Sequence, residues 1–245
     1  MAESLEYSLR EGIGWLQMDD GGVNAMDLAF CQGMQALLDT AEEDGSHGLV
    51  ISGRPGCFSA GLNFKVLSAL AMPEVRETTS AFMETMKRVF LFPKPVIAAS
   101  TGHAVAGGLM LFLAADTRLA ADETSSRYGL NEATAGVPFL GGTLGICRYG
   151  IPAQHHTEFI LQGRMLDAQT CAERGVVHEL VETERLLERA GERLEELKDL
   201  SLDVYGTNKR LLREEAYEAS VRTAGKMMDQ APRGNVFASM GRRDP

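Results

Sequence analysis

Three short segments of the chain carry residue types that could do chemistry together: two glycine-rich turns and one isolated carboxylate. The first turn is GCFSAGLN at 56–63 and the second is GHAVAGG at 102–108, and each is expected between a buried strand and a helix. Small residues let a ligand approach the backbone, and free N–H groups at a helix start favour an oxygen that carries negative charge. Each segment alone is also typical of a plain tight turn. Together, however, the N–H groups of the two segments could donate hydrogen bonds to one carbonyl oxygen.

The carboxylate is Glu132, which lies in the otherwise uncharged stretch GLNEATAGVP at 129–138. A carboxylate among small apolar residues is poorly solvated, which raises its pKa and its strength as a base. Glu132 is therefore a candidate general base. The alternative interpretation is a glutamate at a helix start whose oxygens accept hydrogen bonds from backbone N–H groups.

Other catalytic and ligand-binding motifs are excluded by the residues present. Leu109 and Met110 stand where a phosphate-binding loop needs Lys and Ser or Thr, and the spacing does not fit a dinucleotide fingerprint. No G-x-S-x-G elbow surrounds Ser59, so we reject a nucleophilic serine. The four cysteines form no C-x-x-C pair and no cluster with the five histidines. We expect reduced, buried thiols and no metal site.

The periodicity of the chain predicts the elements that position these segments. Alternation over 3–19 predicts a β-hairpin that turns at Glu11-Gly12, and Asp27 is expected to cap a helix that ends at Gly45. Further along the chain we expect strands at 48–52, 96–99, 117–121, 127–130 and 176–181, and helices from about 62, at 74–92, 107–115 and 183–198, and from 201 to about 240. Repeated strand, glycine loop and helix units predict an α/β domain built from stacked repeats.

The character of the sequence changes near residue 200, which predicts a core domain over 1–200 and a helical region over 201–245. The apolar residues of the second part suit packing either on the same chain or on a neighbouring subunit. The sequence leaves both arrangements open.

Composition excludes several classes of function. With 44% hydrophobic and 24% charged residues and a net charge of −10, the chain has no basic face for nucleic acid. No apolar run reaches the roughly 20 residues that span a bilayer, and the first residues lack a signal-peptide pattern, so we expect a cytoplasmic protein without membrane contact. Lys65 and Lys94 could contact phosphates, but exposed, solvated lysines are the expected interpretation.

The motifs FSAGL at 58–62, AGG at 106–108 and GLNE at 129–132, in this order, resemble the crotonase (enoyl-CoA hydratase/isomerase) superfamily. The likeness extends from the N-terminal hairpin to about Val181. It implies an α/β fold, a spiral of ββα repeats with a C-terminal helical trimerisation region, and a homotrimer or hexamer. It also implies an acyl-CoA or acyl-carrier thioester as substrate and no separate cofactor.

The resemblance also implies roles for particular residues. Leu62 and Gly107 would supply the two N–H donors of an oxyanion hole, and Glu132 would move the proton. The loop of the first motif would hold the adenine end of coenzyme A through backbone contacts. The residues expected to bind the substrate are Phe58, Ser59, Ala60, Gly61, Gly108, Met110 and Gly136.

One departure from the family pattern decides the expected reaction. Typical hydratases carry two glutamates, and Met110 stands at the first position, leaving Glu132 at the second. The 3,2-trans-enoyl-CoA isomerases look similar to this, so we expect transfer of a 3-enoyl double bond to the 2-trans position. The alternatives are a one-glutamate hydratase, a carrier-bound acyl decarboxylase and a non-catalytic acyl-CoA binding protein.

Overall fold

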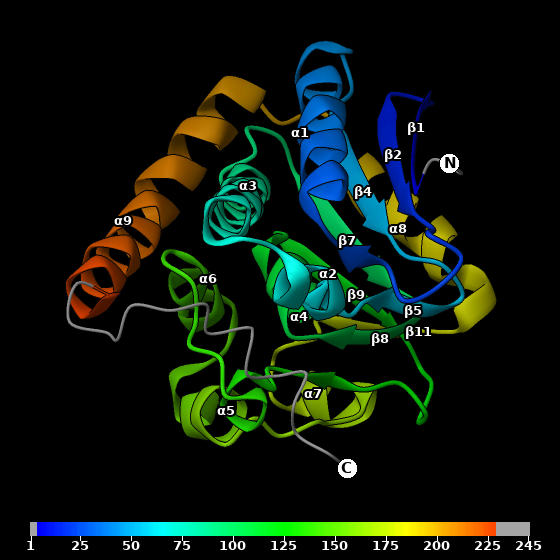
Figure 1. Ribbon diagram of the computed structural model, residues 1–245. Helices are drawn as coiled ribbons and strands as arrows, with labels where there is room; N and C mark the ends of the chain where they lie inside the picture. Colours follow the sequence, from blue (N-terminus) through cyan, green and yellow to red (C-terminus); the bar gives the residue numbers. More distant parts are fainter. Residues whose placement is uncertain (1–3, 229–245) are drawn as a thin grey trace.

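The computed structural model describes residues 4–228 of the chain (Figure 1). Its strands are β1 (Leu5–Arg10), β2 (Ile13–Met18), β3 (Ala25–Met26), β4 (Gly48–Ser52), β5 (Gly56–Ser59), β6 (Gly61–Leu62), β7 (Val96–Ser100), β8 (Gly102–Val105), β9 (Thr117–Ala121), β10 (Tyr128–Gly129) and β11 (Glu179–Val181). Its α-helices are α1 (Leu28–Glu43), α2 (Phe64–Ala69), α3 (Met72–Phe90), α4 (Gly107–Ala114), α5 (Glu132–Ala135), α6 (Thr143–Gly150), α7 (Ala168–Glu173), α8 (Leu186–Glu195) and α9 (Leu202–Met228). Single turns of other helix types lie at Ala153–His155, Thr157–Leu161 and Thr183–Arg185.

The strands form one large sheet and two small sheets, and successive segments of the chain contribute strands to them in a repeated order. The six-stranded sheet has the order β1-β2-β4-β7-β9-β11 and is parallel except for the β1–β2 hairpin. Each of β4, β7 and β9 is followed by a strand of the second sheet, β10-β8-β5, and then by a helix. The predicted α/β architecture of ββα repeats is therefore confirmed.

Both faces of the six-stranded sheet are covered, which explains why its central strands are apolar throughout. In β4, Leu49 and Ile51 join the main core on the side of α1 and α3, whereas Val50 joins a smaller cluster under α8. Figure 1 shows α8 and α1 on opposite faces of this sheet. The predicted hairpin is confirmed, as is the helix at 28–43, whose cap residue Asp27 accepts a hydrogen bond from the Phe30 N–H at 2.9 Å.

The two glycine segments, expected as turns between a strand and a helix, contain short strands. Residues 56–62 contain β5 and β6, and β8 occupies 102–105. The helix expected to begin near Leu62 begins at Phe64, after the cap residue Asn63. Strands of two to four residues are too short for alternation to reveal them, and their stability comes from partners far away in the chain.

Lys94 also differs from the prediction, because it is buried rather than solvated. Its Nζ donates to the Ala41 carbonyl at 2.6 Å and to the Ser46 hydroxyl at 3.1 Å, and it lies 3.4 Å from the Asp44 carboxylate. The ammonium thus neutralises the C-terminal end of α1, where free carbonyls concentrate negative charge. Lys65 is exposed, as expected.

The C-terminal helix begins at Leu202, beside the boundary expected near residue 200, and continues as one helix to Met228. It packs against α6 of the same chain (Figure 1). Exposed Leu211 and Leu212 suit a further interface, but the division into two domains and the oligomerisation role stay predictions. The end of the predicted helical region, residues 229–245, lies outside the described residues.

All four cysteines are free and buried, as predicted. Among the helices of residues 4–228, none combines the length and the apolar character that crossing a bilayer requires.

A buried ion cluster fixes α9 to the core. The Asp116 carboxylate lies 2.6 Å from Lys209 Nζ and 2.9 Å from a terminal nitrogen of Arg213, and it accepts the Val96 N–H at 2.7 Å. Both cations are buried, so each depends on this carboxylate as its counter-ion.

Replacing Asp116 with Asn should therefore lower the free energy of unfolding by about 3–5 kcal/mol, because two buried cations lose their counter-ion. Urea unfolding followed by circular dichroism measures this loss. The matched control is Glu215→Gln, which breaks the exposed pair between Glu215 and Arg222 on the same helix and should cost under about 1 kcal/mol. An equal, small effect of both substitutions would contradict this role of the cluster.

Candidate active site

A small cavity unites the residues that could do chemistry. It has a volume of about 20 Å³ and is lined by Leu62, Phe64, Phe82, Ala106, Gly107, Met110, Glu132, Val137, Pro138, Phe139, Leu140 and Thr143. Most of these side chains are apolar, and Glu132 is the one ionisable group among them. The space between these walls has room for about one water molecule, so any larger ligand needs the walls to move apart.

The two glycine segments touch through their backbones. A Cβ atom on Gly61 would lie 2.5 Å from the backbone nitrogen of Gly107, and one on Gly108 would lie 1.9 Å from the Ser59 carbonyl oxygen. Gly61 also has a φ of +79°, which disfavours any other residue. Only glycine at these positions allows β6 to pack directly on the start of α4.

This contact places two N–H groups at the cavity. Gly107 is the first residue of α4, where N–H groups have no partner within the helix. In β6, the Asn63 N–H donates to the Met26 carbonyl at 2.8 Å. Successive N–H groups of a strand point to opposite sides, so the Leu62 N–H points away from β3. Leu62 and Gly107 both line the cavity.

Ala106, between the strand β8 and the helix α4, has an unusual backbone. Its φ of +49° and ψ of −123° are disfavoured for a residue with a Cβ atom, at a cost on the order of 1–3 kcal/mol. Its N–H donates to the Gly129 carbonyl at 2.8 Å, and its carbonyl accepts the Met110 N–H at 3.0 Å. The strained residue thereby ties the start of α4 to β10, the strand that leads to Glu132.

Glu132 is 5% exposed, and its Oε2 has no hydrogen-bond partner among the described residues. Burial raises the pKa of this carboxyl from 4.5 to about 7, partly offset by a hydrogen bond from its own backbone N–H. The alternative interpretation, a carboxylate whose oxygens are all satisfied by backbone donors, does not fit the unpaired oxygen. A buried carboxyl with an unpaired oxygen and a raised pKa is a candidate proton acceptor near neutral pH.

The structure brings four of the predicted site residues together at the cavity: Leu62, Gly107, Met110 and Glu132. The other predicted site residues do not line the cavity but lie in the segments next to it. The Phe58 ring packs on the Phe112 ring with centroids 5.5 Å apart, and Gly136 ends α5 with a φ of +74°. Ala60 donates its N–H to the Val23 carbonyl at 2.9 Å.

Ser59 does not act as a nucleophile in this arrangement. It is fully buried, and its hydroxyl donates to the Asn24 carbonyl at 2.7 Å while accepting the Gly61 N–H at 3.0 Å.

Sequence reasoning missed the aromatic walls of the cavity. Phe82 comes from the buried face of α3, and its ring would lie 2.9 Å from a Cβ atom on Gly107. In the sequence Phe82 looks like an ordinary core residue of an amphipathic helix. Phe139 lies in the 137–142 loop, between α5 and α6.

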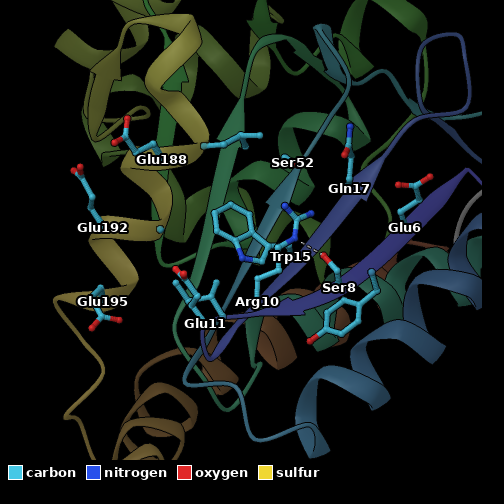
Figure 2. Close-up of a pocket in the computed structure, with 14 residues that line it drawn as sticks. Glu6, Ser8, Arg10, Glu11, Trp15, Gln17, Ser52, Glu188, Glu192 and Glu195 are labelled. Carbon is cyan, nitrogen blue, oxygen red and sulfur yellow. Dashed lines mark hydrogen bonds between the residues drawn. The ribbon is translucent and has the colours of Figure 1, made fainter.

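A much larger groove of about 710 Å³ lies between the β1–β2 hairpin and α8 (Figure 2). It contains Trp15 and Arg10 and a row of α8 glutamates, of which Glu192 pairs with Arg189 at 3.0 Å. None of the predicted site residues lines it. We therefore place the chemistry in the small cavity. Within residues 4–228, no group of three or more His, Cys, Asp or Glu side chains is placed to hold a metal ion.

Comparisons with known proteins show the family and the fold of this chain. Residues 8–238 match the family model described as enoyl-CoA hydratase/isomerase. The chain is 31% identical over 221 residues to a fatty acid oxidation complex subunit alpha of Vibrio vulnificus, covering 86% of this chain and 31% of that protein. It is 30% identical over 200 residues to a carnitinyl-CoA dehydratase of Citrobacter koseri, covering 80% and 75%. The chain thus spans about a third of the length of the fatty acid oxidation subunits that it matches.

Solved structures show the same fold. A probable enoyl-CoA hydratase of Mycobacterium tuberculosis superimposes with a TM-score of 0.85 at 26% identity, covering 93% of this chain and 97% of that one. A second structure of that same protein, described as an enoyl-CoA isomerase, gives a TM-score of 0.82 at 25% identity over the full length of both chains. The chain therefore belongs to the enoyl-CoA hydratase/isomerase family and has the crotonase fold.

Proposed function

We propose that the protein is an acyl-CoA isomerase that shifts a 3-enoyl thioester double bond to the 2-trans position. The observation that carries this proposal is the lining of the cavity, in which Glu132 is the one ionisable side chain and lies with Leu62 and Gly107. A double-bond shift needs a single group that removes a proton and returns it. Hydration is served better by two carboxylates, one to orient the water and one to deliver the proton.

In the proposed mechanism, the thioester oxygen accepts hydrogen bonds from the N–H groups of Leu62 and Gly107. The Glu132 carboxylate removes a proton from C2, and the electron pair of that C–H bond forms a dienolate whose negative charge lies on the thioester oxygen. The two N–H groups stabilise this charge. Protonated Glu132 then returns the proton to C4 and becomes a carboxylate again, so no atom is gained or lost.

Met110 supports the isomerase over the hydratase. Its thioether lines the cavity where a second acid or base would be needed, and it cannot transfer a proton. An apolar cavity with room for about one water also limits the competing water, which protects a reactive enolate. A one-glutamate hydratase remains the second candidate, because a cavity of about 20 Å³ admits one water beside Glu132.

The same proposal covers the substrate, cofactor and assembly. The substrate is a thioester of coenzyme A or of a carrier protein, and no cofactor is needed because the proton that leaves C2 is the one that reaches C4. The exposed apolar residues of α9, Leu211 and Leu212 among them, support a homotrimer or hexamer.

Replacing Glu132 with Gln should lower kcat for 3-hexenoyl-CoA by about 10²–10⁴, because the amide cannot accept the C2 proton. The assay follows the absorbance of the 2-enoyl thioester and the mass of the product. Glu173→Gln, the same change at an exposed glutamate, serves as the control and should leave kcat unchanged.

The other outcomes of this assay select among the alternatives. A product heavier by one water would identify a hydratase. Full turnover by the Gln variant would favour a decarboxylase-type site that relies on its N–H donors. No turnover by the unmodified protein would leave an acyl-CoA binding protein.

The pH dependence of kcat/KM should follow the carboxyl of Glu132. Because the carboxylate is the active form and burial raises its pKa to about 7, kcat/KM should rise through about pH 7 and level off above it. Initial rates in buffers from about pH 5 to 9 measure this profile, with Glu173→Gln as the control that keeps it. A profile that stays flat across this range would show that another group is the base.

Stability should depend on the same carboxyl in the opposite direction. The folded protein holds the Glu132 proton up to about pH 7, whereas the unfolded chain releases it near 4.5, so ionisation costs folding free energy as the pH rises between these values. Glu132→Gln should therefore be more stable than the unmodified protein by roughly 3 kcal/mol above pH 7 and by under about 1 kcal/mol near pH 5. Urea unfolding at both pH values tests this. A stability difference that does not change with pH would mean that burial does not raise the pKa of the Glu132 carboxyl.

A further inference from the structure

A buried polar network lies directly behind β6, on the side away from the cavity. At its centre is Asn24, which is fully buried and has a φ of +50°. Its Nδ2 donates to the Met18 carbonyl at 2.9 Å and to the Phe58 carbonyl at 3.0 Å. One side chain thus joins the end of β2 to β5.

Ser59 extends this network to the cavity. Its hydroxyl donates to the Asn24 carbonyl at 2.7 Å and accepts the Gly61 N–H at 3.0 Å. Gly61 needs this support because it has a φ of +79° and lies against the start of α4. The next peptide unit carries the Leu62 N–H, so the orientation of Gly61 sets the direction of that donor.

The network is anchored by Asp20 on its other side. Its Oδ1 accepts the Asn24 N–H at 2.9 Å, its Oδ2 accepts the Ala25 N–H at 3.1 Å, and its own N–H donates to Asn24 Oδ1 at 3.0 Å. Both polar ends of the Asn24 side chain are therefore bonded, and the residue has no freedom to reorient. A fully satisfied buried network of this kind fixes one geometry.

We propose that Ser59 and Asn24 are positioning residues of the oxyanion hole, which hold Gly61 so that the Leu62 N–H faces the thioester oxygen. This inference rests on the proposed function. Neither side chain lines the cavity, so both act through the backbone of β6. It also gives Ser59 a role other than the direct substrate binding expected from the sequence.

The first test compares Ser59→Ala with Ser46→Ala. Ser46 is also buried, and its replacement by Ala also removes two hydrogen bonds. It differs in position, because it lies before the first residue of β4, whereas Ser59 follows the last residue of that strand. Ser59→Ala should lower kcat for 3-hexenoyl-CoA by about 10- to 100-fold with KM within about twofold, because a misaimed donor weakens transition-state binding. Ser46→Ala should change stability only.

The second readout is the carbonyl stretching frequency of bound hexanoyl-CoA labelled at its carbonyl carbon, measured by infrared difference spectroscopy. Hydrogen bonds to the thioester oxygen lower this frequency. The shift should persist in Glu132→Gln and Ser46→Ala and should shrink in Ser59→Ala. A purely structural role of Ser59 would leave it unchanged.

Asn24→Gly provides an independent variant, since glycine tolerates the positive φ while removing both donors of the side chain. It should reproduce the loss of kcat and the smaller carbonyl shift. Unchanged kcat and an unchanged carbonyl shift in folded Ser59→Ala or Asn24→Gly would overturn the proposal, as would equal losses in Ser59→Ala and Ser46→Ala.

The saturated thioester separates this inference from the reaction itself. If the unmodified protein fails to isomerise 3-hexenoyl-CoA but shows a carbonyl shift that Ser59→Ala loses, the proposed function is wrong and the positioning role holds. If the unmodified protein isomerises and Ser59→Ala matches it in both readouts, the positioning role is wrong and the proposed function holds.

Discussion

Direct backbone contact between β6 and the start of α4 is the constraint on which the rest of the site depends. At Gly61 and Gly107 two segments that are far apart in the sequence meet with no side chain between them, and a single added methyl group would force them apart. The contact brings two N–H groups to one cavity. Hydrogen-bond donors that are fixed before the substrate arrives need no reorganisation during the reaction, which is the main source of their effect.

The repeated ββα units explain how such a contact is reached. In each repeat the chain runs from the large sheet through a short strand of the second sheet to a helix. The backbone just before the helix of the first repeat therefore lies beside the start of the helix in the second repeat. The third repeat delivers β10, which pairs with β8 at Val105 and then leads into Glu132. Leu62, Gly107 and Glu132 therefore lie on consecutive repeats. The strain at Ala106 is tolerated because its hydrogen bonds to β10 and α4 hold it from both sides.

Much of this could be predicted from the sequence, because hairpins, amphipathic helices and fully apolar strands leave local patterns. The cap at Asp27 is an example. The resemblance to the family, rather than a local pattern, pointed to Leu62, Gly107 and Met110, which the structure brings to the cavity together with Glu132. The pattern gave no sign of β5, β6 and β8, since their stability depends on partners in other repeats. The burial of Lys94 was missed for the same reason, because its carbonyl partner and its hydroxyl partner lie about 50 residues away.

The small volume of the cavity has a consequence for how fast the proposed thioester would bind. Because the space between the walls is about 20 Å³, an acyl chain would require a conformation in which groups such as Phe139 and Leu140 have moved aside. The observed affinity is then the affinity of that open form reduced by the fraction of molecules that adopt it. Association is correspondingly slower than the encounter of the two molecules, and substitutions that loosen the 137–142 loop change the rate of binding without touching the groups that move the proton.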